Sequence, residues 1–215
     1  MRKALAGILV MCASMAQADE VVIAALGDSL TQGYGLVQDE GFVPQLQQWL
    51  VENGAPEVRL INAGVSGDTT AGGLSRVGWT LEPEVDGMIV TLGGNDILRG
   101  LDPAQARSNI DGILQAAGAA DVDVLLVGLQ APPNFGAQYK TDFDRLYPDL
   151  AETYGTLYFP SFFTGLSEGG ELAPPSELRE WFQADGIHPN AQGVARIVAA
   201  MGPAVLELVA RIEEE

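Results

Sequence analysis

The sequence predicts an α/β protein with a five-stranded parallel sheet, and two patterns carry this prediction. Short apolar runs of strand length recur about every 30 residues, and segments with helical spacing of their apolar residues lie between them. This alternation is typical of βαβ units, in which helices cover both faces of a parallel sheet. The strands are expected at residues 21–26, 58–62, 88–92, 122–129 and 156–159.

The first strand and the helix after it illustrate the two periods. Residues 21–26 are all apolar, as expected for a strand that is buried on both faces. The following segment carries its large apolar residues on one helical face and ends at the helix stop Asn53-Gly54. Those face residues are Phe42, Leu46, Trp49 and Leu50.

The remaining predicted helices are marked by caps and by the same spacing. Asp102 and Pro103 form a cap and first residue for a helix that turns Ile110, Ile113, Leu114 and Ala117 inward. Another helix carries Phe143, Leu146, Leu150 and Tyr154 on one face. The last helix is expected to begin near Asn190, with Pro203 kinking or restarting it.

The N-terminal segment reads as a secretory signal peptide, residues 1–18. A basic start at Arg2 and Lys3 precedes an apolar stretch, and Ala16-Gln17-Ala18 fits the small-residue cleavage rule. An uncleaved membrane anchor is the alternative, but the apolar stretch is shorter than the roughly 20 residues that a spanning helix needs. We therefore expect export to the periplasm or the medium, with residues 19–215 as one domain. No later apolar run is expected to span a membrane.

Composition limits the chemistry of that domain. The only cysteine, Cys12, lies in the predicted signal peptide, so the mature chain is expected to lack disulfides and thiol catalysis. A single histidine and no mature cysteine leave no zinc cluster, so no metal is expected. The formal net charge of −18 disfavours nucleic acid and anionic lipid as partners. We expect a monomer without stable membrane insertion.

Polar, glycine-containing segments follow three of the predicted strands. They are residues 27–30, 64–69 and 93–96, and a fourth polar segment, residues 185–190, precedes the last helix. Because the carboxyl ends of parallel strands share one edge of a sheet, these segments are expected to meet there. Each segment alone also has a structural explanation as a turn or a helix cap, and this is the role we expect for Asp28, Asp68 and Asp96.

Together the segments contain the groups that acyl transfer requires. Ser29 supplies a hydroxyl that becomes nucleophilic only when a base takes its proton. His188 is the only histidine, and Asp185 lies three residues before it, placed to orient its ring. The oxyanion of the intermediate needs hydrogen-bond donors, for which we predict the backbone N–H of Ser29 and Gly67 and the side-chain amide of Asn95.

A competing nucleophile motif occurs at Ser167. Residues 165–169 read G-L-S-E-G, which matches the G-x-S-x-G elbow of α/β-hydrolases. That elbow needs a strand before it and a helix after it, whereas Gly169-Gly170 and Pro174-Pro175 follow here and oppose a helix. We therefore expect Ser29, and not Ser167, to be the nucleophile.

The four segments resemble the four sequence blocks of the SGNH (GDSL-type) hydrolase superfamily, and within it the bacterial thioesterase I, lysophospholipase and arylesterase subfamily. The blocks are marked by Ser29, Gly67, Asn95 and His188, and Asp185 stands in the Asp-x-x-His arrangement. The resemblance implies a flavodoxin-like three-layer α/β/α fold, no cofactor and broad acyl-ester activity. It also implies that Leu98, Leu101, Pro133 and Phe135 border the acyl chain.

The sequence thus predicts a serine esterase that hydrolyses small acyl esters and thioesters through an acyl-enzyme on Ser29. A carbohydrate acetylesterase of the same superfamily and a non-catalytic binding module on the same scaffold are the alternatives. Low aromatic content, 7% of residues, argues against sugar stacking. An intact Ser29, Asp185 and His188 set argues against the binding module.

Overall fold

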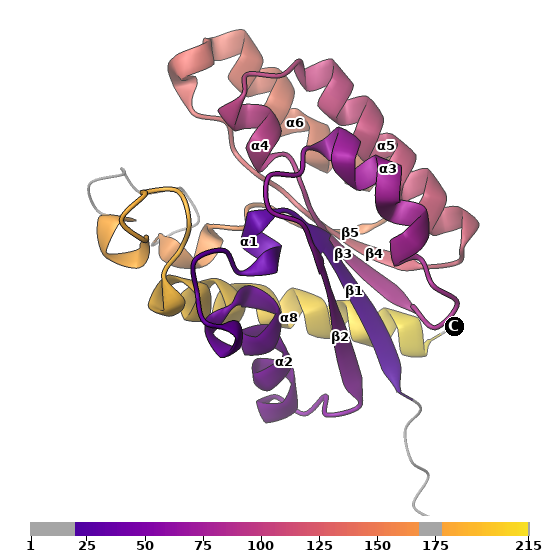
Figure 1. Cartoon of the computed structure of the whole chain (residues 1–215). Helices are drawn as coiled ribbons and strands as arrows, with labels where there is room; N and C mark the ends of the chain where they lie inside the picture. The colour runs from indigo at the N-terminus through magenta and orange to yellow at the C-terminus, as the bar shows by residue number, and fades with distance from the viewer. Residues whose placement is uncertain (1–19, 168–177, 215) are drawn as a thin grey trace, which may run out of the picture.

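The computed structural model describes residues 20–167 and 178–214, so the predicted signal peptide lies outside the described residues. Five parallel strands form one sheet in the order β2-β1-β3-β4-β5 (Figure 1), which confirms the predicted number and direction of the strands. They are β1 Val21–Gly27, β2 Val58–Gly64, β3 Gly87–Thr91, β4 Asp123–Val127 and β5 Leu157–Phe159. This is the strand order of flavodoxin-like folds.

Helices cover both faces of the sheet and make the predicted three layers. On one face lie α2 (Phe42–Glu52) and α8 (Ala191–Glu213), which pack against each other. On the other face lie α3 (Thr70–Thr80), α5 (Pro103–Ala119) and α6 (Ala137–Tyr154) (Figure 1). Two short helices, α1 Ser29–Gln32 and α4 Gly94–Leu98, stand at the carboxyl ends of β1 and β3. The 3₁₀ helices are η1 Gln38–Glu40, η2 Pro133–Phe135, η3 Thr164–Leu166 and η5 Arg179–Trp181.

The apolar runs of the sequence become the central strands. All seven residues of β1 and all five of β3 are buried, because both faces of these strands are covered. Caps fix the helix starts as predicted: the Asp102 side chain accepts from the Ala104 N–H at 2.9 Å, and the Asn190 side chain accepts from the Gly193 N–H at 2.9 Å. These caps set where α5 and α8 leave the loops.

α8 runs through Pro203 without interruption, so the helix does not restart at this residue. Proline removes a backbone donor and so frees the carbonyl four residues earlier, here that of Ala199. Both residues are exposed, so water can bond this carbonyl while the buried face of α8 keeps its packing. Pro148 sits inside α6 in the same way.

Among the described residues, α8 is long and apolar enough to cross a membrane by length and composition. This corrects the expectation that no later segment reaches that length. Half of its most apolar stretch is buried inside the protein, where it packs on α2 and the sheet. A helix that covers a sheet needs such an apolar face, so its composition follows from its place in the core.

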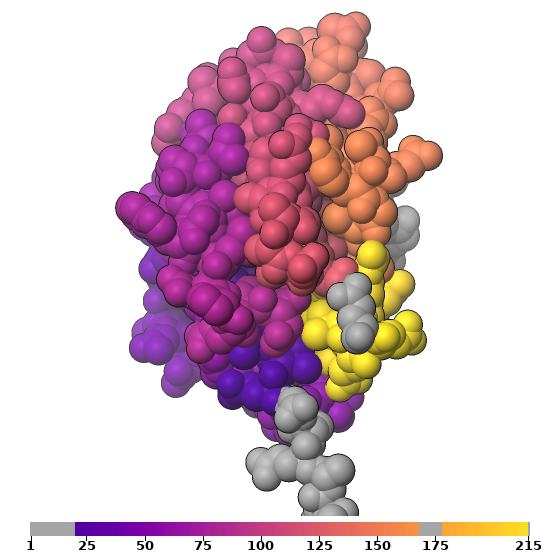
Figure 2. All heavy atoms as spheres, turned by 90° about the vertical axis from the view of Figure 1, so that its right-hand side faces the viewer, coloured from indigo at the N-terminus to yellow at the C-terminus, as the bar shows by residue number. Residues whose placement is uncertain are grey.

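The described chain begins and ends on one side of the molecule. Figure 2 views this side, which carries the amino ends of the strands, with the start of β1 in indigo and the end of α8 in yellow. A Cβ added at Gly87, the first residue of β3, would meet the side chains of both Ile212 and Ile23, so the ends of α8 and β1 are close in space. The opposite edge carries the polar segments.

Candidate active site

The polar segments meet at the carboxyl edge of the sheet. Ser29 is the first residue of α1, Gly67 lies in the loop after β2, and Asn95 lies in α4 directly after β3. The strand order places β1 between β2 and β3, so the three loops are neighbours. This is the point where the strand order reverses, the usual place for a ligand site in such sheets.

Three of the predicted side chains form a hydrogen-bonded series. His188 Nε2 lies 2.9 Å from Ser29 Oγ, and His188 Nδ1 lies 2.6 Å from Asp185 Oδ2. The tautomer that is protonated on Nδ1 donates to Asp185 and leaves Nε2 free to accept the Ser29 hydroxyl proton. Ser29 and His188 are 159 positions apart in the sequence, and the fold brings them into contact only when β1 and α8 are in place.

The Asp185 carboxylate is held in its charged form. Its Oδ1 accepts from the backbone N–H of Ile187 at 2.9 Å and of His188 at 3.0 Å, which fixes the turn between the two residues. Burial by itself raises the pKa of Asp185, but the hydrogen bonds from the His188 ring and from these two amides outweigh it and lower the pKa to about 2. The group is therefore ionised at neutral pH and orients the imidazole.

Asp28 connects the helix that begins at Ser29 to the predicted oxyanion donor, Asn95. One of its oxygens accepts from the Leu30 N–H at 3.0 Å and so caps α1, and the other accepts from the Asn95 side-chain amide at 3.2 Å. Asp28 is only 2% exposed. Burial is the main cause that raises its pKa to about 6, against the opposing hydrogen bonds from Leu30 and Asn95. Its expected capping role is therefore joined by a second one, positioning Asn95.

Gly67 occupies a turn that only glycine adopts easily. The Asp68 N–H donates to the Val65 carbonyl at 3.1 Å, and Gly67 has φ +86°, the left-handed value that a type II turn needs at its third residue. Arg99 Nη2 donates to the Gly67 carbonyl at 2.8 Å and ties this turn to the end of α4. Among the described residues, the N–H groups of Ser29 and Gly67 have no acceptor.

The carboxylates of Asp68 and Asp96, which are half-buried and buried, hold the site loops together, in line with the structural role expected for them. Asp96 accepts from both the N–H and the hydroxyl of Thr70, at 2.8 and 2.6 Å, and so joins α4 to α3. Asp68 pairs with Arg76 at 2.6 Å, and Arg76 also donates to the Gly27 carbonyl at 2.8 Å. The predicted site loops are thereby cross-linked through charged groups that the sequence motifs do not reveal.

Tyr34 and Gln183 are neighbours of His188 that the sequence did not indicate. The ring centroid of Tyr34 lies 4.7 Å from that of His188. Gln183 Nε2 donates to the carbonyl oxygens of Tyr34, at 2.8 Å, and Pro189, at 3.0 Å, and its backbone N–H donates to the His188 carbonyl at 2.8 Å. Gln183 therefore joins the loop after α1 to the loop that carries His188. Neither residue belongs to a motif, so only the fold reveals them.

The four residues expected to border an acyl chain lie on two adjoining loops. Leu98 and Leu101, at the end of α4 and just beyond it, are 58% and 39% exposed, and Phe135, in η2, is 43% exposed. Pro133 begins the same 3₁₀ helix. A Cβ added at Gly100 would lie 2.8 Å from the Phe135 ring, so the two loops touch there. Exposed apolar side chains in this arrangement offer a surface for an acyl chain.

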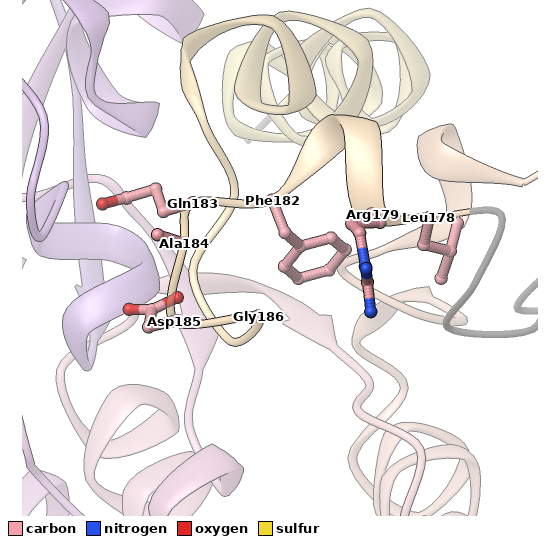
Figure 3. Close-up of a pocket in the computed structure, with 7 residues that line it drawn as sticks. All are labelled: Leu178, Arg179, Phe182, Gln183, Ala184, Asp185 and Gly186. Carbon is pink, nitrogen blue, oxygen red and sulfur yellow. The ribbon is translucent and has the colours of Figure 1, made fainter.

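A cavity of about 730 Å³ lies beside the loop that carries Asp185. The described residues that line it come from one stretch of the chain: Leu178, Arg179, Phe182, Gln183, Ala184, Asp185 and Gly186 (Figure 3). None of the four expected acyl-chain residues lines it. The hollow therefore adds to the site a region that the sequence did not predict.

Two further expectations concern Ser167 and metals. Ser167 follows the 3₁₀ helix η3 and has extended backbone angles, with no strand directly before it, so it does not stand in a strand-to-helix elbow. His188 bonds to Ser29 instead. In residues 20–167 and 178–214, no group of three or more His, Cys, Asp or Glu side chains is placed to hold a metal ion.

Comparisons with known proteins agree with this geometry. Residues 25–196 match the family model described as the GDSL-like Lipase/Acylhydrolase family. The chain is 37% identical to the esterase TesA of Pseudomonas aeruginosa over 206 residues, which cover 95% of this chain and 98% of that protein. It is 36% identical to the thioesterase 1/protease 1/lysophospholipase L1 of Escherichia coli K12 over 176 residues, 81% of this chain and 77% of that protein.

A solved structure supports the same assignment. The crystal structure of AlinE4, described as an SGNH-hydrolase family esterase, superposes with a TM-score of 0.71 at 42% identity, covering 89% of this chain and 97% of AlinE4. The matched region includes the segments that bring Ser29, Gly67, Asn95 and His188 together. The chain belongs to the GDSL-like lipase/acylhydrolase family of SGNH hydrolases.

Proposed function

We propose that this protein hydrolyses acyl esters and thioesters through a covalent acyl-enzyme on Ser29. It is a serine esterase by its family, and the observation that carries the mechanism is the continuous series of hydrogen bonds from Ser29 through His188 to Asp185. A nucleophile, a base and a group that orients the base are the three parts that acyl transfer by serine requires.

The proposed reaction has two steps, acylation of Ser29 and hydrolysis of the acyl-enzyme. Ser29 Oγ attacks the acyl carbonyl while His188 takes its proton, and the new oxyanion is held by the amides of Ser29 and Gly67 and by the side chain of Asn95. His188 returns the proton to the departing alkoxide or thiolate. In the second step His188 activates a water molecule, which releases the acid from Ser29.

The substrate class follows from the site and from the relatives. Proteins similar to this chain are named an esterase and a thioesterase/lysophospholipase, so esters and thioesters of small or lipid-like alcohols and thiols are the substrates we propose. The exposed apolar residues Leu98, Leu101, Pro133 and Phe135 would contact the acyl chain. The chain's own side chains and backbone amides supply the chemistry, and no cofactor is proposed.

We also propose that the protein acts as an exported monomer. Residues 1–18 have the pattern of a cleaved signal peptide, and cleavage after Ala18 leaves a chain without cysteine. Expression of the full chain in a Gram-negative host, followed by intact mass measurement of the periplasmic and culture fractions, tests this. A mature chain starting at Asp19 is expected; an uncleaved chain in the cytoplasm would exclude export.

The mechanism is tested with p-nitrophenyl esters of short to long acyl chains, on the parent and on Ser29→Ala. Loss of a serine nucleophile is expected to reduce kcat by on the order of 10⁶. Ser75→Ala is the matched control, because Ser75 is an exposed serine of α3 whose hydroxyl only bonds the Gly72 carbonyl at 2.7 Å. It should retain the parent rate.

The three possible outcomes distinguish Ser29 as the nucleophile, a different nucleophile, and a protein that does not hydrolyse these esters. Activity that disappears only in Ser29→Ala supports the proposed nucleophile, and the chain-length profile then describes the acyl groove. Equal activity in the parent and Ser29→Ala would exclude Ser29. An inactive parent would remove acyl-ester hydrolysis from the proposal.

A further inference from the structure

The cavity next to Asp185 is lined by a cationic side chain that has no hydrogen-bond or ion-pair partner among the described residues. Arg179 lines the cavity, and its guanidinium has no hydrogen bond or ion pair with any described residue. Every other Lys or Arg in residues 20–167 and 178–214 has an acceptor: Arg59, Arg76, Arg99, Arg107, Lys140, Arg145, Arg196 and Arg211. In a chain with 29 acidic residues, Arg179 is thus the one cationic side chain of the described residues without an acceptor among them.

Local geometry aims this cation at the cavity together with apolar side chains. Arg179 opens the 3₁₀ helix η5, and Phe182 follows three residues later. Phe182 is the C-cap of η5 and has extended backbone angles. Figure 3 shows the Phe182 ring, the Arg179 guanidinium and Leu178 side by side along one wall, with Gln183 to Gly186 at its end. A ligand with a charged group and a short apolar part fits such a wall.

The cavity wall is tied directly to the catalytic base. Phe182 forms an antiparallel bridge with Pro189, the residue after His188, and the Gln183 N–H donates to the His188 carbonyl at 2.8 Å. In acyl transfer the leaving group must lie next to this histidine, because His188 protonates it. The cavity adjoins the loop that carries this histidine, whereas Leu98, Leu101, Pro133 and Phe135 stand on other loops.

We propose that Arg179, Phe182 and Leu178 form a subsite for an anionic group carried by the alcohol or thiol part of the substrate. Carboxylates and phosphates share this chemistry, since a guanidinium donates paired hydrogen bonds to either. The net charge of −18 repels such substrates at long range, and a cation without a partner among the described residues would offset this repulsion locally. This inference rests on the proposed hydrolase function and adds a substrate class to it.

The test uses three thioesters that share one hexanoyl chain and differ in the thiol. N-acetylcysteamine gives a neutral leaving group, N-succinylcysteamine gives a carboxylate, and a third thiol carries a phosphate monoester in place of that carboxylate. The readout is the ratio of kcat/KM for each anionic substrate to that for the neutral one, measured by thiol release. Using a ratio cancels any change in the amount of folded enzyme.

For the parent, we expect the kcat/KM ratio to favour at least one anionic substrate over the neutral one. Arg179→Gln should lower this ratio about tenfold, because it removes a charge-assisted hydrogen bond at an exposed group. Arg179→Lys should fall between the two, because it keeps the charge without the paired donors. Arg145→Gln is the matched control: Arg145 is an exposed arginine of α6 with one long ion pair, to Asp149 at 3.9 Å, and its ratio should equal the parent's.

Each outcome has one meaning. A lower ratio for the carboxylate alone, or for the phosphate alone, supports the subsite and identifies its ligand. A ratio that is the same in Arg179→Gln and the parent overturns the subsite but leaves ester hydrolysis in place. An equal fall in Arg145→Gln also overturns it, because general electrostatics would then explain the effect. A parent that cleaves none of the three overturns the hydrolase proposal itself.

Discussion

At the scale of single residues, the Asn95 side chain is held by a buried carboxylate. Asp28 accepts one of its amide hydrogens at 3.2 Å, which leaves the second for a substrate oxygen. A donor that is fixed before the reaction needs no reorganisation when the oxyanion forms. This hydrogen bond therefore joins the residue after β1 to α4, the helix that follows β3, next to Ser29.

Replacing Asn95 with Ala should lower kcat by about 10² to 10³ with a small effect on KM, because the lost donor acts on the oxyanion in the transition state. Steady-state kinetics on one p-nitrophenyl ester measures this. Asn53→Ala is the control, since Asn53 only caps the end of α2 through the Trp49 carbonyl. An unchanged kcat in Asn95→Ala would remove Asn95 from the oxyanion site.

Asp28 should leave a signature in the pH dependence of stability. Its pKa is raised from 3.8 to about 6 in the folded protein, so between these values the folded state binds more protons than the unfolded state. Its contribution is complete below about pH 4 and is lost as the pH rises through about 6, a change on the order of 3 kcal/mol. Asp28→Asn keeps the cap and cannot titrate.

Urea unfolding of the parent and of Asp28→Asn at pH 4 and pH 7 measures this loss. Groups that both proteins share cancel in the comparison, so the variant should gain stability relative to the parent as the pH rises. Parallel pH profiles would show that Asp28 titrates normally. Asp185, whose pKa is lowered to about 2, acts with the opposite sign and only below about pH 4, outside this window.

Which site residues are visible in the sequence depends on how they act. Ser29, His188 and Asp185 are reactive types in local motifs, and the sequence predicted that they meet. Tyr34 and Gln183 act through a ring contact and backbone carbonyls, and Arg99 acts through the Gly67 carbonyl. Such contacts depend on where loops pass one another in space, which no local pattern records.

At the scale of elements, the two helices on one face of the sheet approach closely at a glycine. A Cβ added at Gly202 of α8 would lie 2.5 Å from the Trp49 ring of α2. A side chain there would push the two helices apart. Gly78 of α3, in contrast, has no atom within 4 Å of an added Cβ and is exposed. The two glycines therefore make a matched pair.

Gly202→Ala should lower the free energy of unfolding by about 1–3 kcal/mol, because the added methyl group overpacks the α2–α8 contact. Gly78→Ala should raise it by about 0.5–1 kcal/mol, because alanine is the better helix former. Thermal and urea unfolding measure both. A Gly202→Ala variant as stable as the parent would show that α2 and α8 can separate without loss.

The elements themselves were largely predictable, since the strands and capped helices follow from apolar runs and from cap residues such as Asp102 and Asn190. The restart considered for α8 at Pro203 does not occur, because this proline lies on the exposed face of the helix, where water can bond the carbonyl that it frees. The cavity beside η5 was not predictable. Phe182, which lines it, pairs with Pro189 in a bridge that has no sequence signal.

At the scale of the whole molecule, the charge imbalance should make stability depend on salt. The formal net charge is −18, and the ion pairs between described residues are mostly exposed, so repulsion among unpaired carboxylates dominates. Sodium chloride screens this repulsion. Raising the sodium chloride concentration from about 10 mM to about 150 mM, where the Debye length falls to about 8 Å, should raise the Tm by about 2–4 °C. A falling Tm would mean that attractive pairs dominate.

The nucleophile is the claim on which the whole assignment depends, and labelling with a fluorophosphonate followed by mass spectrometry of the intact chain and its peptides tests it most directly. One adduct per chain is expected, on the peptide that contains Ser29, and none on Ser29→Ala, because His188 Nε2 lies 2.9 Å from the Ser29 hydroxyl. An adduct on the peptide with Ser167, or equal labelling of the parent and Ser29→Ala, would contradict it.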